Sequence, residues 1–168
     1  QYKNNITTIE NPVEIIIPGI HQININPESN FLFFDALRAT LRQDPDIILI
    51  GEIRDKKTAS LAIHAAQTGH LVFSTLHSNN TVDSITRLIN LGIEPFNLSD
   101  SLLMIMAQRL IRKRCPICQS NSLQPPNNKK SNLATEGKLI NKCLECLNGF
   151  SGRIPIVEIL YVDQSIKQ

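Results

Sequence analysis

The sequence predicts an α/β fold built on a mostly parallel sheet. Short strand-like runs alternate with longer helix-like segments over residues 6–110, which is the pattern of βα units. Two of the runs, residues 46–51 and 71–76, are rich in aliphatic and β-branched side chains, as expected for strands covered on both faces. Because 168 residues suffice for one such core and a small second module, we expect one α/β domain with an appendage.

Helical spacing and a capping residue predict the first two helices. In residues 31–43 the apolar side chains recur at helical spacing, and Arg38 and Arg42 lie four residues apart on one face. A second helix is predicted over residues 56–68, because Asp55 directly before it is a suitable N-cap. This helix separates the two strongest strand predictions, so the expected order is strand, helix, strand.

Two further amphipathic helices are expected, over residues 81–91 and from about residue 98 to residue 112. Gly92 and Pro95 interrupt the chain between them. The second helix would end in four cations, which would complement the dipole of its C-terminus; contact with nucleic acid is the alternative interpretation. The four cations are Arg109, Arg112, Lys113 and Arg114.

Charge and hydropathy exclude few classes of protein. A formal net charge of +2 is too small to indicate a nucleic-acid partner or an acidic membrane surface by itself. The longest uninterrupted apolar run, residues 102–107, is far shorter than the roughly 20 residues that span a bilayer. The first residues show no signal-peptide pattern. We therefore expect a soluble, intracellular protein.

Four cysteines form two CxxC pairs, one on each side of an Asn-, Ser-, Lys- and Pro-rich segment at residues 119–142. In an intracellular protein such pairs favour a tetrahedral zinc site over disulfides. Four thiolate ligands leave no open position for water, so the predicted site is structural rather than catalytic. Four unrelated buried cysteines are the alternative. The pairs are Cys115 with Cys118 and Cys143 with Cys146.

A carboxylate follows the first of the two apolar strands. Glu52 comes directly after the run that ends at Gly51, and ligands bind at the carboxyl ends of strands in open α/β sheets. A carboxylate there can hold Mg²⁺ that bridges phosphate oxygens. By itself, a glutamate in this position is more often an ordinary surface residue.

Three segments together resemble the secretion ATPases that power type II secretion and type IV pilus assembly. "LRATLRQDPDIILIGEIRD" resembles the segment containing their Walker B motif, "AAQTGHLVFSTLHSNNT" their histidine box, and "ITTIENPVE" their aspartate box. The tetracysteine pattern is also similar to this family, and is typical of its type II secretion and pilus-extension branches rather than of its retraction motors. The segments occur in the family's order and, with the cysteines, cover nearly the whole chain.

The resemblance implies a fold and roles for individual residues. It implies part of a RecA-like P-loop ATPase core over residues 1–114, a tetracysteine zinc-binding insertion over residues 115–148, and a C-terminal segment, residues 149–168, that returns to the core. Glu10 matches the glutamate thought to polarise the attacking water, and Glu52 the Walker B glutamate at Mg²⁺.

The histidine box has two readings. By the resemblance, His70 and His77 would lie near the γ-phosphate of ATP. The two histidines also bracket a predicted buried strand, and they could instead satisfy backbone groups at its ends. This alternative is stronger for His70 than for His77.

The resemblance also implies assembly. Arg38 and Arg42 match arginines that can reach nucleotide at a subunit boundary in ring ATPases of this kind; an ion pair with Asp44 or Asp46 is the alternative. The family implies a homohexameric ring in the cytoplasm, associated with the inner membrane through a platform protein, with nucleic acid an improbable partner. The choice between protein secretion and pilus assembly stays open.

Two departures from the family pattern bear on activity. Asn11 stands where the family usually has aspartate, which removes one negative charge beside Glu10. None of the seven glycines opens a G-x-x-x-x-G-K-[ST] sequence, so the loop that cradles phosphates is missing. We therefore expect a chain that begins partway through the ATPase domain and is inactive alone. A non-enzymatic zinc module that binds a partner or nucleic acid, and an inert remnant of a truncated gene, are the alternatives.

Overall fold

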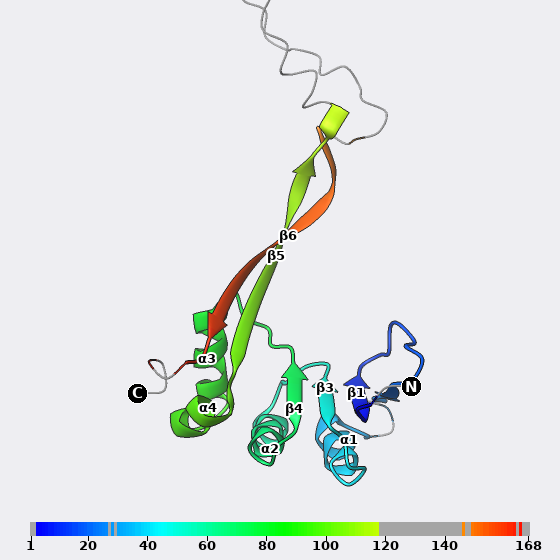
Figure 1. The fold of residues 1–168 in the computed structure, drawn as a ribbon, viewed down its shortest axis with the longest axis vertical. Helices are drawn as coiled ribbons and strands as arrows, with labels where there is room; N and C mark the ends of the chain where they lie inside the picture. Colours follow the sequence, from blue (N-terminus) through cyan, green and yellow to red (C-terminus); the bar gives the residue numbers. More distant parts are fainter. Residues whose placement is uncertain are drawn as a thin grey trace, which may run out of the picture. The chain divides into compact units, whose positions relative to one another are not determined.

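The structure, a computed structural model, describes residues 3–26, 28, 30–117, 146, 149–163 and 165. These belong to two compact units, one made of residues 1–107 with 158–168 and one made of residues 108–157. The first unit carries a parallel sheet and four helices (Figure 1). No helix among the described residues has the length and apolarity needed to cross a bilayer.

The first unit is built on a four-stranded parallel sheet, as the sequence predicts. Its strand order is β2-β1-β3-β4. Thr8 of β1 lies opposite Gln22 of β2 and Leu49 of β3, and Leu49 lies opposite Phe73 of β4. Residues in register across a parallel sheet point to the same face, so these four side chains share one face. The strands are β1 (Ile6–Glu10), β2 (His21–Asn24), β3 (Ile47–Ile50) and β4 (Leu71–Ser74).

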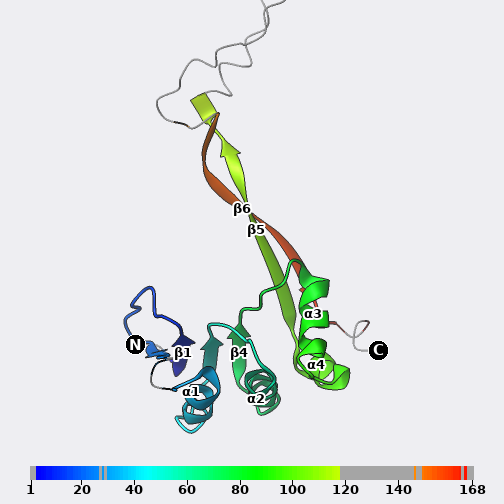
Figure 2. The ribbon, with the colours of Figure 1, turned by 180° about the vertical axis from the view of Figure 1, so that it is seen from behind.

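The opposite face is covered by α1 (Phe33–Thr40) and α2 (Lys56–Gln67), which lie beside the strands in both views (Figures 1 and 2). Ile9, Ile48 and Ile50 are fully buried there, together with alanines and a leucine of the two helices. Asp55 caps α2 as predicted, because its Oδ1 accepts a hydrogen bond of 2.9 Å from the Thr58 backbone N–H.

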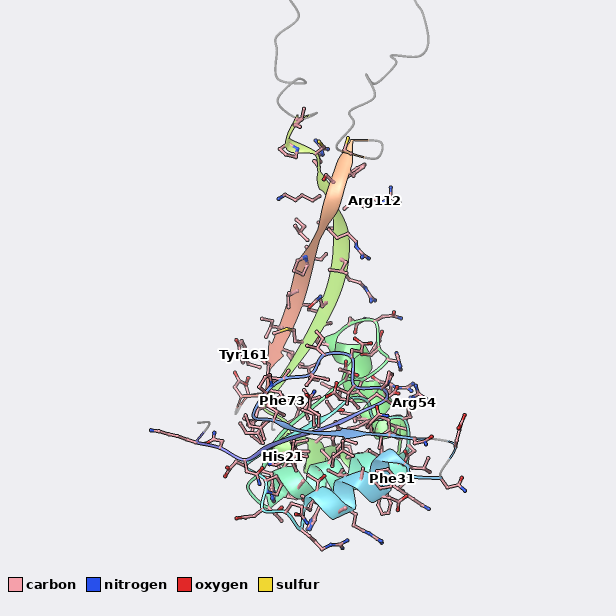
Figure 3. All side chains as sticks on the ribbon, turned by 90° about the vertical axis from the view of Figure 1, so that its right-hand side faces the viewer. His21, Phe31, Arg54, Phe73, Arg112 and Tyr161 are labelled. Carbon is pink, nitrogen blue, oxygen red and sulfur yellow. The ribbon has the colours of Figure 1, made fainter. Side chains whose placement is uncertain are left out.

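The face that carries Leu49 is open. Leu49, Leu71 and Phe73 expose 37, 40 and 48% of their surfaces, and Phe73 is labelled in Figure 3. Strands of parallel sheets are normally covered on both faces. Within the described residues, β4 also pairs with β3 alone, and a largely apolar cavity of about 470 Å³ lies beside it, lined by residues that include Val72, Phe73 and Met104.

Beyond the sheet, α3 (Thr81–Asn90) and α4 (Pro95–Ser101) precede a long strand pair, β5 (Met104–Arg114) and β6 (Phe150–Tyr161). The predicted helix over residues 98–112 is therefore wrong, since α4 ends at Ser101. Hydrogen bonds from the Val162 N–H to the Leu103 carbonyl and from the Cys115 N–H to the Gly149 carbonyl show that the two strands run antiparallel.

The four cations after residue 108 consequently lie on a strand and not at a helix C-terminus. The guanidinium of Arg112, labelled in Figure 3, lies 5.9 Å from the ring centroid of Phe150, which is within cation–π range. The helix-dipole interpretation of this cluster is thus wrong.

Candidate hydrolytic site at the carboxyl edge of the sheet

Glu52 is the centre of the candidate site. It follows β3, and its carboxylate oxygen Oε2 lies 2.5 Å from Nε of Arg54 and 3.2 Å from Nε2 of His77. Only 13% of its side chain is exposed, against 76% for His77. The contact between Glu52 and His77 is a hydrogen bond in the tautomer that carries its proton on Nε2. The site therefore holds one shielded carboxylate between an arginine and a solvent-facing imidazole.

His77 reaches Glu52 because the segment after β4 is fastened to the segment after β3. The Thr75 hydroxyl donates to the Gly51 carbonyl oxygen at 2.5 Å, and the Ile53 N–H donates to the Thr75 carbonyl oxygen at 3.1 Å. These two bonds extend the pairing of the strands beyond their ends. Polar residues that follow two neighbouring parallel strands, Glu52 after β3 and His77 after β4, are thereby brought together in one site.

The helix that follows His77 is held at its N-terminus from two directions. The N-cap Asn80 accepts from the Asp83 N–H at 2.7 Å. Glu158, on β6, accepts from both the N–H and the hydroxyl of Thr81 on one carboxylate oxygen, at 3.2 Å for the N–H. A carboxylate at a helix N-terminus is favoured by the exposed N–H groups and by the helix dipole.

Gly51 permits the close approach of β1 and β3 at this edge. Its N–H donates to the Ile9 carbonyl oxygen at 2.7 Å. A Cβ atom at this position would lie 3.0 Å from that oxygen and 3.4 Å from Cα of Glu10. Only glycine fits here without a shift of β1, and the fit brings the backbone of Glu10 next to the turn that carries Glu52.

Glu10 ends β1 and is half-buried. Its Oε1 accepts hydrogen bonds from the Thr8 hydroxyl at 2.6 Å and from the Gln22 side-chain amide at 3.1 Å. Glu10 thus ends β1, Glu52 follows β3 and His77 follows β4, so all three lie at the carboxyl edge of the sheet.

The whole chain, residues 1–168, matches the family described as "Type II/IV secretion system protein". The chain belongs to this family. The site at the carboxyl edge is therefore part of a secretion-family protein, and the resemblance inferred from the sequence motifs is confirmed.

Characterised relatives of this secretion-family chain come from pilus and secretion systems. The "Type IV pilus assembly ATPase PilB" of Pseudomonas aeruginosa is 47% identical over 167 residues, which cover 93% of this chain and 29% of PilB. The "Type II secretion system protein E" of Dickeya dadantii is 44% identical over 169 residues, covering 98% of this chain and 34% of that protein. The chain thus spans about a third of the length of these relatives.

A solved structure of the pilus retraction motor PilT with bound ADP is also similar. It is 32% identical, has a TM-score of 0.66, and is matched over 98% of this chain and 40% of PilT. The VirB11 ATPase of Brucella suis has a TM-score of 0.61 at 16% identity, with 99% of this chain and 42% of VirB11 covered; this likeness shows the fold alone.

The structure does not bring His70 to the other candidate residues. His70 directly precedes β4, whereas His77 follows it. Its Nδ1 lies 2.9 Å from the Ala65 carbonyl oxygen and 3.2 Å from the Thr68 hydroxyl. Its side chain therefore satisfies backbone at the end of α2, as the alternative interpretation of the histidine box has it.

Arg38 and Arg42 also lie away from Glu52. Arg38 is on α1, and the chain after α1 is bound near the amino ends of the strands, where the Asn5 side chain donates to the Gln43 carbonyl oxygen at 2.9 Å. Both arginines are exposed, and the ion pairs found among the described residues include neither. The alternative interpretation, a bridge to Asp44 or Asp46, is thus not formed among the described residues.

Two of the four predicted zinc ligands belong to the described part of the chain. Cys115 is buried and Cys146 is half-buried, and neither forms a disulfide. Cys118 and Cys143 lie outside the described residues, as does most of the predicted zinc module.

Three partners of the candidate residues were not foreseen from the sequence. Arg54 contacts Glu52, and Thr8 and Gln22 contact Glu10. Thr8 carried a usable signal, because residues two apart on a strand share a face. No such signal exists for Gln22, because the sequence does not show that the strand of Gln22 pairs with the strand of Glu10.

The arrangement fits a metal that arrives with its substrate better than a resident one. Among the described residues no group of three or more His, Cys, Asp or Glu side chains could hold a metal ion. Mg²⁺ characteristically binds through one or two carboxylates and completes its octahedron with waters and substrate phosphates. Glu52, a single shielded carboxylate at the strand end, matches that requirement.

Proposed function

We propose that this chain is the C-terminal part of an ATPase motor that drives type IV pilus assembly or type II secretion, and that Glu10, Glu52 and His77 form its hydrolytic edge. The contact of 3.2 Å between His77 Nε2 and the shielded Glu52 carboxylate carries this proposal, because it joins the Walker B and histidine-box motifs in one site. The enzymatic relatives, an ATPase for pilus assembly among them, support it.

In this proposal each residue has one task. Glu52 would hold Mg²⁺ through the water shell of the ion, and the ion would supply positive charge that neutralises the phosphate groups. Arg54 and His77 keep the Glu52 carboxylate in place, while the exposed part of the His77 ring faces a γ-phosphate. Glu10 orients the water that attacks it, a type of general-base assistance that contributes about 10² to 10⁴ in rate.

The phosphate-binding loop would come from a preceding segment of the same protein. The sequence contains no G-x-x-x-x-G-K-[ST] motif, and the chain matches about a third of its relatives' length. The open face of the sheet, and the edge of β4 that pairs with no second strand among the described residues, support a core that further chain completes, as expected of part of a RecA-like ATPase domain.

Ring assembly belongs to the same proposal. Exposed Arg38 and Arg42, without an ion-pair partner among the described residues, would supply positive charge to nucleotide held by a neighbouring subunit of a homohexamer. The motor would act in the cytoplasm on an inner-membrane platform protein.

Turnover of MgATP tests the proposed chemistry. We expect no hydrolysis by the 168-residue chain alone, and hydrolysis by the complete protein that carries it. Glu52→Gln in the complete protein should leave nucleotide bound and reduce turnover at least about 100-fold. Glu28→Gln, which changes an exposed carboxyl outside the site, is the matched control. Undiminished turnover in Glu52→Gln would refute the assignment.

We further propose that the four cysteines hold one structural zinc ion. Buried, reduced Cys115 lies directly after β5, and its N–H donates to the Gly149 carbonyl oxygen at 2.8 Å, so this thiol is placed where the two strands end. Elemental analysis of reduced protein should find about one zinc per chain. Replacing Cys115 and Cys146 by serine should abolish it, and His77→Ala should leave it unchanged. A wild-type preparation without zinc would contradict the site.

A further inference from the structure

We propose that Thr8 and Gln22 are positioning residues that fix the Glu10 carboxylate, so that one oxygen is anchored and the other is presented to the reacting water. This inference rests on the proposed function, which assigns Glu10 to that water. It adds two residues to the site, both outside the motifs' acidic and histidine positions. Their placement follows from the sheet register.

Thr8, Glu10 and Gln22 share one face of the sheet. Thr8 and Glu10 are two residues apart on β1, and Gln22 of β2 lies opposite Thr8. This is the open face, where no helix among the described residues covers the side chains. The three polar groups therefore meet beside the carboxyl edge, where Glu10 is half-buried and keeps part of its surface exposed.

Both hydrogen bonds to Glu10 end on the same oxygen. Oε1 accepts from the Thr8 hydroxyl at 2.6 Å and from Gln22 Nε2 at 3.1 Å. No hydrogen bond from another described residue reaches Oε2. A carboxylate offers acceptor sites on both oxygens, so the two donors leave Oε2 to accept a proton or to orient a water molecule.

The Gln22 amide cannot turn over, because all of its hydrogen-bonding groups are engaged. Its second N–H donates to the Ile15 carbonyl oxygen at 3.0 Å, and its Oε1 accepts from the Ile17 N–H at 2.7 Å. Reversal of the amide would set oxygen against the Glu10 carboxylate and the Ile15 carbonyl, and NH₂ against the Ile17 N–H. The loop after β1 thus locks Gln22 as a donor toward Glu10.

Thr8 supplies the second anchor from inside the sheet. It is only 6% exposed, so water does not readily replace its bond to Glu10, and a buried hydroxyl without a partner costs free energy. Its strand is central, with β2 and β3 on either side, which leaves the donor little freedom to move.

Asn11 makes this anchoring more important. With an amide in place of the usual aspartate, Glu10 has no second carboxylate directly beside it in the sequence. A single carboxylate that orients water must itself be held in position, because small misplacements of a catalytic group lower the rate steeply. The two neutral donors provide that orientation without adding charge.

Steady-state kinetics of the complete protein test the inference. Thr8→Val, which keeps the shape and removes the hydroxyl, and Gln22→Met should each lower kcat about tenfold and leave KM for MgATP within about twofold. Thr8→Ser keeps the hydroxyl and should stay within about twofold of wild type. If Thr8→Val fails to fold, judged by its thermal unfolding midpoint, Gln22→Met on the edge strand decides.

A second background separates positioning from general stability. When Thr8→Val or Gln22→Met is added to Glu10→Gln, the residual kcat should not fall further, because both residues act through the Glu10 carboxylate. Equal losses in both backgrounds, or wild-type kcat in both single variants, would overturn the inference. If Glu10→Gln itself retains full turnover, the proposed role of Glu10 is overturned as well. If Glu10→Gln is slow but Thr8→Val and Gln22→Met both keep the kcat of the wild type, only the positioning role is overturned.

Discussion

The two faces of the parallel sheet are made by alternate residues of the same strands, yet they differ sharply. On the covered face, Ile9, Ile48 and Ile50 are fully buried under α1 and α2. On the open face, Leu49 and Phe73 expose over a third of their surfaces. Neighbouring residues of β3 therefore lie against a closed core on one side and against solvent on the other.

One face of the sheet supplies the packing, and the other carries residues of the candidate site. The covered face supplies the packing that aligns the strands, and the described residues buried there are apolar or are threonines. The open face carries Thr8 opposite Gln22, and Glu10 two residues beyond Thr8. The core thus holds the strands in place, and the site lies on the opposite face of the same sheet.

The largest expected effect comes from opening the covered face. Ile48→Ala removes a fully buried side chain and should lower the free energy of unfolding of the 168-residue chain by about 4 kcal/mol. Leu49→Ala, one residue further on and on the other face, should lower it by less than about 1 kcal/mol. Urea denaturation measures both, and equal losses would show that the faces do not differ in packing.

A smaller effect should distinguish the chain from the complete protein. Phe73→Ala should change the stability of the 168-residue chain by less than about 1 kcal/mol, because Phe73 is 48% exposed. In the complete protein we expect a loss of about 3 kcal/mol, since further chain would cover this face. Thermal or urea unfolding of both forms gives the comparison. The same small loss in the complete protein would mean that the open face stays open.

The smallest effect concerns a helix of the covered face. Asp55→Ala removes bonds of 2.9 Å to the Thr58 N–H and 2.8 Å to its hydroxyl, and should cost about 1 kcal/mol. Asp55→Asn keeps an acceptor at the N-cap and should cost less than about 0.5 kcal/mol. Urea unfolding midpoints measure both losses. An equal loss of stability in Asp55→Asn and Asp55→Ala would assign the effect to charge and not to capping.

The sequence was sufficient where structure depends on near neighbours. The run before Glu52, the N-cap Asp55 and the strand before His77 were all predicted correctly, and they lead to the contact between Glu52 and His77. The separation of His70 from His77 could also have been foreseen. A four-residue strand separates it from His77, and at about 3.3 Å per residue this puts the two at opposite ends of the sheet.

Long-range pairing could not be read from the sequence. Residues 104–112 match an amphipathic helix locally, but they form β5 because β6, far along the chain, pairs with them. The partner of Thr8 and Glu10 was equally hidden, since nothing local indicates that Gln22 lies on the adjacent strand. Tertiary context outweighs local propensity in both cases.

The bond between Thr81 and Glu158 has a consequence for the order of events during synthesis. The two residues are 77 positions apart, so at about 5 to 20 residues per second the ribosome adds Glu158 roughly 4 to 15 s after Thr81. During that interval Asn80 caps the N-terminus of α3 without Glu158. The helix that follows His77 therefore acquires its second tether only after β6 has been synthesised.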